Sequence, residues 1–212
     1  MSMSKWARPA GLTALVVATV SCGDVVRQGR APVLLVIDSL AAARGSSTAS
    51  GTFTGTLSSD VITNVTSPDP CSAKSPCPTV FSDGGQVILR IVPKDIGHPA
   101  NPTTPSTNNE VTVTRYRVTY RRADGRNTPG ADVPYGFDGA ATGTVPASGT
   151  LTLGFELVRI VAKEEPPLVQ LINSPTFITT IADVTFYGRD QVGNDINVTG
   201  SIQIDFGNFG DF

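Results

Sequence analysis

Histidine and tryptophan are nearly absent from this sequence of 212 residues, which contains one of each. The lone histidine, His98, cannot supply the several histidines that most acid–base and zinc-dependent mechanisms use. Charged residues make up 16% of the chain, below the roughly 25% of typical globular proteins. The formal net charge of −2 argues against nucleic acid as a partner. The polar surface must consist largely of Thr, Ser, Asn and Gly, which favours a β-rich domain.

The sequence motifs of common enzyme classes are missing as well. The chain contains no Gly-x-Ser-x-Gly, no Gly-x-x-x-x-Gly-Lys, no His-Glu-x-x-His and no Cys-x-x-Cys. These absences remove the nucleophile elbow, the phosphate-binding loop, the zinc-protease helix and the redox dithiol. The sequence therefore predicts no catalytic residues and no cofactor.

Near the N-terminus, the apolar stretch at residues 11–20 falls well short of the roughly 20 residues that a transmembrane helix needs. It follows two basic residues, Lys5 and Arg8, and precedes the small residue Ser21. A basic region, a short apolar region and a small residue before the cut describe a secretory signal peptide. We therefore expect the chain to be exported.

Cys22 follows this segment directly, and the residues Thr19-Val20-Ser21-Cys22 resemble the lipobox of bacterial lipoprotein precursors. The resemblance implies that Cys22 is diacylated and becomes the N-terminus of the mature chain. Thr19 departs from the apolar residue usual in that family, and the alternative is an ordinary secretory signal that is cut nearby. Gly23 stands where an Asp would signal inner-membrane retention, which favours the outer membrane.

The lipobox resemblance implies three segments. Residues 1–21 would be the signal peptide, residues 22–30 the lipidated N-terminus and tether, and residues 31–212 a single domain. Removal of the leader would change the formal net charge to −4. Each buried CH₂ group of an acyl chain contributes about 0.8 kcal/mol, so two or three chains hold a soluble domain at a membrane.

The sequence contains three cysteines, an odd number that is awkward in an oxidising compartment. If Cys22 is acylated, Cys71 and Cys77 remain as a pair within a segment of prolines and small residues that favours a turn. A disulfide between them would close a short loop and contribute about 2 kcal/mol. The alternatives are a redox pair or half of a metal site, but His98 has no second ligand near it in the sequence.

Short strand patterns separated by turn residues dominate the rest of the chain. Apolar or alternating runs predict strands at residues 32–38, 52–57, 60–65, 86–93, 142–145 and 150–161. A closing hairpin is predicted at residues 181–187 and 196–206, with its turn at 190–195. The proline-rich residues 96–109 are expected to form a long exposed connection.

The most regular pattern lies at residues 110–122. Apolar and polar side chains alternate in its second half, as in a half-buried strand. Val111 and Val113 lie in the opposite phase, which predicts a bulge or twist near Thr114.

About seven to nine strands with at most one short helix, at residues 163–172, favour an antiparallel two-layer β-sandwich. The Tyr-x-Val-x-Tyr strand and the closing hairpin resemble immunoglobulin-like or fibronectin type III modules over residues 30–206. The resemblance implies an all-β, immunoglobulin-like fold. A true immunoglobulin domain would have a core Trp between paired cysteines, whereas Trp6 lies in the leader. The fold by itself transfers no function.

Three arginines, Arg115, Arg117 and Arg121, form a stripe on the strand predicted at residues 110–122. Their guanidinium groups would suit phosphate or carboxylate on lipid, polysaccharide or a protein partner. The alternative is a polar sheet face on which the arginines pair with acidic residues of neighbouring strands, such as Glu156.

The predicted turn of the closing hairpin carries Asp190, Asn194 and Asp195. Their side-chain oxygens are ligands suited to calcium. Ordinary turn chemistry explains the same residues without a metal. We therefore predict no metal site and keep these three residues as a calcium candidate.

Taken together, these patterns predict a lipid-anchored protein of the cell envelope with a binding or assembly role. Its partners would be the membrane, through the lipid, and an envelope protein or polysaccharide. The alternative is an enzyme that acts on envelope carbohydrate through carboxylates such as Glu164-Glu165 or Asp138. Carboxylates clustered in a deep cleft would favour the enzyme, whereas a flat sheet face or an exposed edge strand would favour a binding module.

Overall fold

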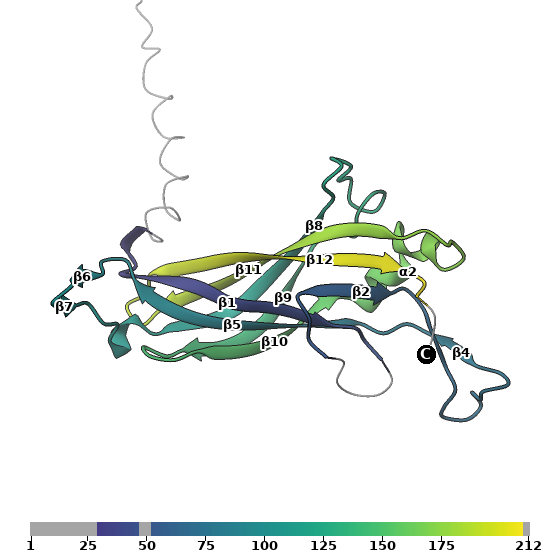
Figure 1. The fold of residues 1–212 in the computed structure, drawn as a ribbon, viewed down its shortest axis with the longest axis horizontal. Helices are drawn as coiled ribbons and strands as arrows, with labels where there is room; N and C mark the ends of the chain where they lie inside the picture. Colours follow the sequence, from purple (N-terminus) through teal and green to yellow (C-terminus); the bar gives the residue numbers. More distant parts are fainter. Residues whose placement is uncertain (1–28, 47–51, 210–212) are drawn as a thin grey trace, which may run out of the picture.

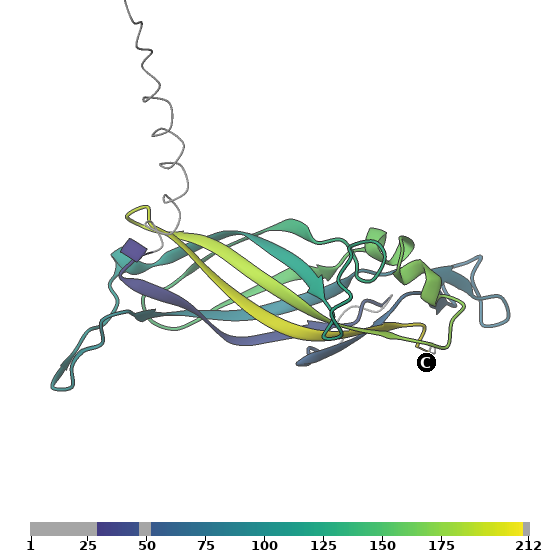
Figure 2. The same ribbon diagram turned by 90° about the horizontal axis from the view of Figure 1, so that it is seen from above.

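The computed structural model describes residues 29–46 and 52–209. The predicted signal peptide, Cys22 and most of the predicted tether lie outside these described residues. Two sheets run along the long axis of the molecule and pack face to face (Figures 1 and 2). Their buried apolar side chains form one core cluster, as expected for a two-layer β-sandwich.

The smaller sheet has three strands in the order β1–β5–β10, with bounds Val33–Ala43, Asp83–Pro93 and Leu151–Val158. The larger sheet has five strands in the order β2–β12–β11–β8–β9, with bounds Thr56–Asp60, Asp195–Gly207, Ile178–Asp190, Val111–Arg121 and Phe137–Val145. Two short hairpins project as arms beyond the sheets, β3–β4 (Thr63–Val65, Cys77–Thr79) and β6–β7 (Gly97–His98, Asn101–Pro102).

The strand order is that of an immunoglobulin-like sandwich. In the lettering of those domains, the smaller sheet corresponds to A–B–E, and the last four strands of the larger sheet to G–F–C–C′. The predicted all-β, two-layer fold is therefore confirmed. One pair departs from the antiparallel prediction, since β2 runs parallel to β12. The chain crosses from the smaller sheet to the larger one after β1, so β2 adds to the free edge of the last strand.

The bulge predicted in β8 is present. The register of β8 shifts between Val113 and Arg115 against β9, and it shifts at the same place against β11. Val113 and Tyr116 are both buried, although three positions separate them, because the bulge at Thr114 reverses the phase of the side chains.

An aromatic cluster joins the two sheets behind β8. The ring of Tyr116 lies 5.2 Å from that of Phe155 on β10, centroid to centroid, and Phe155 lies 5.3 Å from Phe186 on β11. The hydroxyl group of Tyr120 donates a 2.7 Å hydrogen bond to the backbone carbonyl of Leu157. Burial raises the pKa of Tyr120, so this hydroxyl remains a donor in the core.

The prediction of a single helix at residues 163–172 is wrong in its bounds. An α-helix of one turn, α2 (Ile160–Glu164), is followed by a 3₁₀ turn, η3 (Leu168–Leu171). Pro166 and Pro167 separate them, because a residue before proline disfavours the helical region and proline has no N–H to donate.

Other predicted boundaries also shift. The connection predicted at residues 96–109 contains the β6–β7 hairpin and a 3₁₀ turn, η2 (Thr107–Asn109). The strand predicted at 142–145 begins earlier, at Phe137, and the one predicted at 150–161 ends earlier, at Val158, where α2 follows. The closing hairpin is longer than predicted at both ends.

Candidate functional site

The candidate site is the outer face of the larger sheet, where β8 carries the arginine stripe. Arg115, Arg117 and Arg121 are each about half exposed on this face. Tyr187 of β11 lies opposite Arg115, and Asp138 of β9 lies opposite Arg117. Asp183 of β11 lies diagonally across from Arg121. Because β8 has neighbours on both sides, each arginine has acidic or aromatic partners within reach.

Asp138 binds two of these arginines. Its carboxylate lies 3.3 Å from the guanidinium of Arg115 and 3.9 Å from that of Arg117. The guanidinium of Arg115 also stacks on Tyr187, 3.6 Å from the ring centroid, which is a cation–π contact. The stripe and its acidic partner therefore form one polar surface of mixed charge.

Arg121 pairs with Asp183 on β11, with Nε donating a 2.6 Å hydrogen bond. Ser201 of β12 donates a second hydrogen bond of 2.5 Å to the same carboxylate. Burial opposes ionisation of Asp183, but the hydrogen bonds from Arg121 and Ser201 outweigh it and lower the pKa of this carboxyl. The bond to Asp183 raises the pKa of Arg121.

Neighbouring strands therefore supply acidic partners for the stripe. This agrees with the alternative drawn from the sequence, a polar sheet face on which the arginines are ion-paired. The named partner differs, however. Glu156 lies on β10 in the smaller sheet and pairs with Arg159, at 3.7 Å. The sequence did not reveal which strands would be neighbours.

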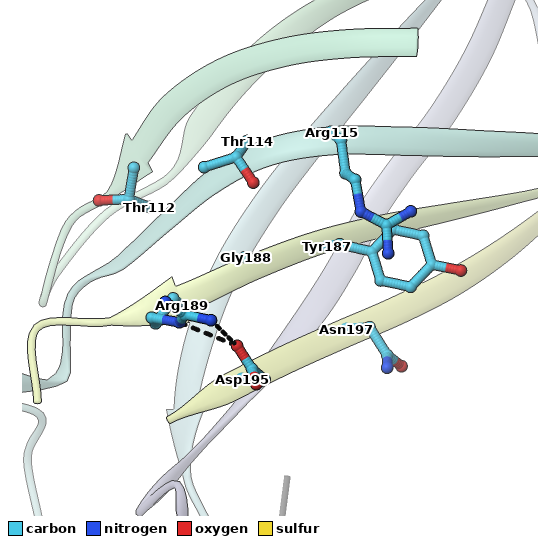
Figure 3. Close-up of a pocket in the computed structure, with 8 residues that line it drawn as sticks. All are labelled: Thr112, Thr114, Arg115, Tyr187, Gly188, Arg189, Asp195 and Asn197. Atoms are coloured by element: carbon cyan, nitrogen blue, oxygen red, sulfur yellow. Dashed lines mark hydrogen bonds and ion pairs between the residues drawn. The ribbon is translucent and has the colours of Figure 1, made fainter. Parts of the chain in front are cut away.

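A shallow pocket of about 440 Å³ opens beside the stripe, where the bulge of β8 meets β11 and β12 (Figure 3). It is lined by Thr112, Thr114, Arg115, Tyr187, Gly188, Arg189, Asp195 and Asn197. A Cβ on Gly188 would lie 2.8 Å from the carbonyl oxygen of Thr112, so glycine allows the strands to approach closely here. Guanidinium, hydroxyl and amide groups around one aromatic ring suit a polar ligand such as a sugar or a carboxylate.

The sequence analysis missed this pocket. Five of its residues belong to β11 and β12, and four of them, Tyr187, Arg189, Asp195 and Asn197, point outward by simple alternation, which the predicted hairpin implied. They lie beside the bulge of β8 because β11 pairs with β8. These two strands are far apart in the sequence, so the pairing could not be predicted from it.

The calcium candidate is arranged as a hydrogen-bonded turn. One carboxylate oxygen of Asp190 accepts from the backbone N–H groups of Val192 and Asn194, at 3.1 and 2.7 Å. The other accepts from the side-chain amide of Asn194 at 2.7 Å, and Asp195 instead pairs with Arg189 at 2.7 Å. Within residues 29–46 and 52–209, no group of three or more His, Cys, Asp or Glu side chains is arranged to hold a metal ion.

Cys71 and Cys77 form the predicted disulfide, with an S–S distance of 2.07 Å. The disulfide lies within the β3–β4 arm, which we call the disulfide arm, at the end of the sandwich opposite β6–β7 (Figure 1). It therefore stabilises a local loop and does not cross the core.

A buried ionic cluster lies at the same end as this arm, where β5 begins and α2 packs. The ammonium of Lys163 lies 2.8 Å from the carboxylate of Asp83, and both side chains are buried. The hydroxyl of Ser59 and the backbone N–H of Gly45 also donate to Asp83, at 2.6 and 2.8 Å. Burial lowers the pKa of Lys163, although Asp83 opposes the shift.

A second pair completes the cluster. Asp60, almost fully buried at the end of β2, forms an ion pair with Arg44 and accepts the backbone N–H of Phe209 at 3.1 Å. Two cations and two carboxylates thus balance one another, which offsets the cost of removing them from water. The sequence analysis did not predict this cluster.

The carboxylates considered for catalysis are dispersed. Glu164 and Glu165 are exposed at the end of α2, whereas Asp138 lies on the outer sheet face between two arginines. The structure does not bring these carboxylates together in a cleft.

No protein-family model, no curated protein and no solved structure matches this chain. In the part of the chain that the structure describes, no helix is both long enough and apolar enough to cross a membrane.

Proposed function

We propose that this chain is a lipoprotein of the cell envelope, anchored through Cys22, and that its β-sandwich binds or assembles with another envelope component. The observation that carries this proposal is the disulfide between Cys71 and Cys77. It accounts for two of the three cysteines in the sequence and leaves Cys22, which ends the lipobox-like motif. Disulfides persist in oxidising compartments, so the pair also supports export.

The outer face of the larger sheet supports binding as the mode of action. It is a broad polar face with exposed arginines and threonines and the half-buried Tyr187, next to a shallow pocket. A polysaccharide or protein would bind here by replacing Asp138 as the partner of Arg115 and Arg117, because those pairs are exposed and weakly held. The partner would therefore carry carboxylate, phosphate or hydroxyl groups.

Anchoring is tested by separating membrane and soluble fractions of cells that produce the full chain. We expect the unchanged protein in the membrane fraction and the Cys22→Ser variant in the soluble fraction, because the acyl chains would supply the membrane affinity. The double variant Cys71→Ser/Cys77→Ser is the control and should stay with the membrane. A Cys22→Ser variant that remains membrane-bound would contradict the anchor.

Binding is tested by pulling the protein out of its native envelope and identifying what accompanies it. Reversing the charges of Arg117 and Arg121 to Glu should remove the partner or reduce its recovery about tenfold, because the anionic groups would be repelled. Arg90→Glu is the matched control, since Arg90 is also exposed and ion-paired, at 2.5 Å to Asp38, but lies on the smaller sheet. Equal recovery with all variants would exclude the stripe as the binding surface.

A further inference from the structure

One end of the sandwich groups the first described residues of the chain with three connections between strands. Residues 29–32 lead into β1 at this end (Figures 1 and 2). The connections from β5 to β8, from β9 to β10 and from β11 to β12 lie at the same end, because these strands run antiparallel in the two sheets. The β6–β7 arm of the first connection projects furthest from the sheets (Figure 2). We call this the N-terminal end.

In the connections at the N-terminal end, the charged side chains Lys94, Asp95 and Glu110 lie next to the strands, and the stretches between them are uncharged. Residues 96–109, 146–150 and 191–194 contain no Asp, Glu, Lys or Arg. The opposite end differs, because its connections at residues 122–136 and 159–177 contain both acidic and basic residues. This contrast sets the two ends of one molecule apart.

Two large aliphatic side chains are exposed on these connections. Ile96, at the base of the β6–β7 arm, is 76% exposed, and Val192, in the turn between β11 and β12, is 65% exposed. Exposed aliphatic residues on projecting loops without charge are suited to the boundary between lipid headgroups and acyl chains.

The length of the tether limits how far the N-terminal end can lie from an anchor at Cys22. Only residues 23–28 separate Cys22 from the first described residue, Gly29. Even a fully extended chain over this distance spans at most about 25 Å. An anchored sandwich would therefore hold its N-terminal end beside the bilayer at a high effective concentration.

We propose that the N-terminal end of the sandwich rests on a lipid surface, with Ile96 and Val192 entering the interface between headgroups and acyl chains. This inference rests on the proposed anchor at Cys22. It fixes the orientation of the molecule, because the disulfide arm, α2 and the ionic cluster would then point away from the membrane. The outer face of the larger sheet would stand upright and remain accessible to a partner.

Tryptophan fluorescence tests the contact, because the only tryptophan, Trp6, lies in the predicted leader. Single-tryptophan variants Ile96→Trp and Val192→Trp are reconstituted, in acylated form, into phosphatidylethanolamine and phosphatidylglycerol vesicles with brominated acyl chains. We expect a blue-shifted emission and about twofold quenching by the bromine atoms at both positions. Phe177→Trp is the matched control, since Phe177 is 63% exposed at the opposite end, and should show neither effect.

Absence of quenching at residues 96 and 192 would overturn the proposed contact, as would equal quenching at residue 177. The mass of the N-terminal peptide of the same samples reports on the anchor separately. If Cys22 is not acylated, the variants are coupled through its thiol to a maleimide lipid and measured again. Quenching at residues 96 and 192 alone would then support the contact surface while rejecting the natural anchor, and its absence would reject the surface.

Discussion

Lys163 is a basic residue in the core, and its side chain is only 1% exposed. Its ammonium is held by Asp83, and Asp83 is held in turn by Ser59 and Gly45. A buried ion pair contributes little net stability compared with apolar residues, but the loss of one partner leaves an uncompensated charge. This cluster therefore makes the junction of β5 and α2 sensitive to single substitutions.

Replacing Lys163 with Met should lower the free energy of unfolding by about 3–5 kcal/mol, because the carboxylate of Asp83 would lose its cation in the core. Urea unfolding measures this change. The control is Lys74→Met, an exposed lysine in the disulfide arm, which should change stability by less than about 0.5 kcal/mol. Adding Asp83→Asn to Lys163→Met should restore part of the loss, and equal stability of the Lys163→Met and Lys74→Met variants would contradict this role.

Asp183 should make stability depend on pH at the acid end. Hydrogen bonds from Arg121 and Ser201 hold its pKa below the ordinary value, so the folded state releases this proton more readily than the unfolded state. The stabilisation is complete above about pH 5, decreases as the unfolded-state carboxyl becomes protonated, and is lost as the pH falls through the folded-state pKa. Asp183→Asn should therefore cost about 1 kcal/mol or less at neutral pH, and the cost should be smaller at about pH 2.

Urea unfolding at both pH values measures this difference. Asp69→Asn, in the exposed part of the disulfide arm, is the control and should change the stability at neutral pH by less than about 0.5 kcal/mol. A variant at residue 183 that loses the same stability at both pH values would show that the carboxylate acts through packing and not through its charge.

At this scale, local chemistry was visible in the sequence and distant partners were not. The pair Cys71–Cys77 followed from counting cysteines, because both members lie in one short loop. The contact between Asp83 and Lys163 joins the start of a strand to a helix far along the chain, and nothing in either local sequence indicates it. Arg115 was recognised as a surface residue, but its stacking on Tyr187 needed the strand order.

Among the elements, β8 was predicted best because its side chains carry two signals at once. The alternation of apolar residues identified the strand, and the change of phase between Val113 and Tyr116 located the bulge. The segment of α2 and η3 was predicted worst. Its apolar spacing resembled one helix, but Pro166 and Pro167 break the hydrogen-bond ladder.

Strand β5 offers a direct test of how tightly the core packs around Phe155, which lies opposite Gly85 on the neighbouring strand β10. A Cβ on Gly85 would lie 2.3 Å from the ring of Phe155, whereas a Cβ on the adjacent Gly84 would meet nothing within 4 Å. Gly85→Ala should therefore destabilise the protein by about 1–3 kcal/mol, because the ring has to move within a packed core.

Gly84→Ala is the matched control and should be neutral or slightly stabilising, since alanine restricts the unfolded chain. Thermal unfolding of both variants gives the comparison. A smaller loss for Gly85→Ala than for Gly84→Ala would mean that Phe155 does not fill the space behind β5.

On the scale of the whole molecule, the two-layer fold was predictable because alternation, turns and the near absence of helix all pointed to it. The strand order was not predicted, since pairing joins segments such as β2 and β12 that lie at opposite ends of the chain. That order determines which residues surround the arginine stripe. It also places the start of β1 at one end and the disulfide arm at the other (Figure 1).

This polarity connects the fold to the proposed function. An anchor at Cys22 would place the N-terminal end, with the exposed Ile96 and Val192, against the bilayer and leave the polar outer sheet face free for a partner. The orientation in the envelope, and with it the accessibility of the outer sheet face, would thus depend on one modification at one residue.

The central claim is tested most directly by the mass of the N-terminal peptide of the protein isolated from its native envelope. The account predicts a peptide that begins at Cys22 and carries the added mass of a diacylglyceryl group. A peptide that begins at another residue, or one with an unmodified Cys22, would contradict it.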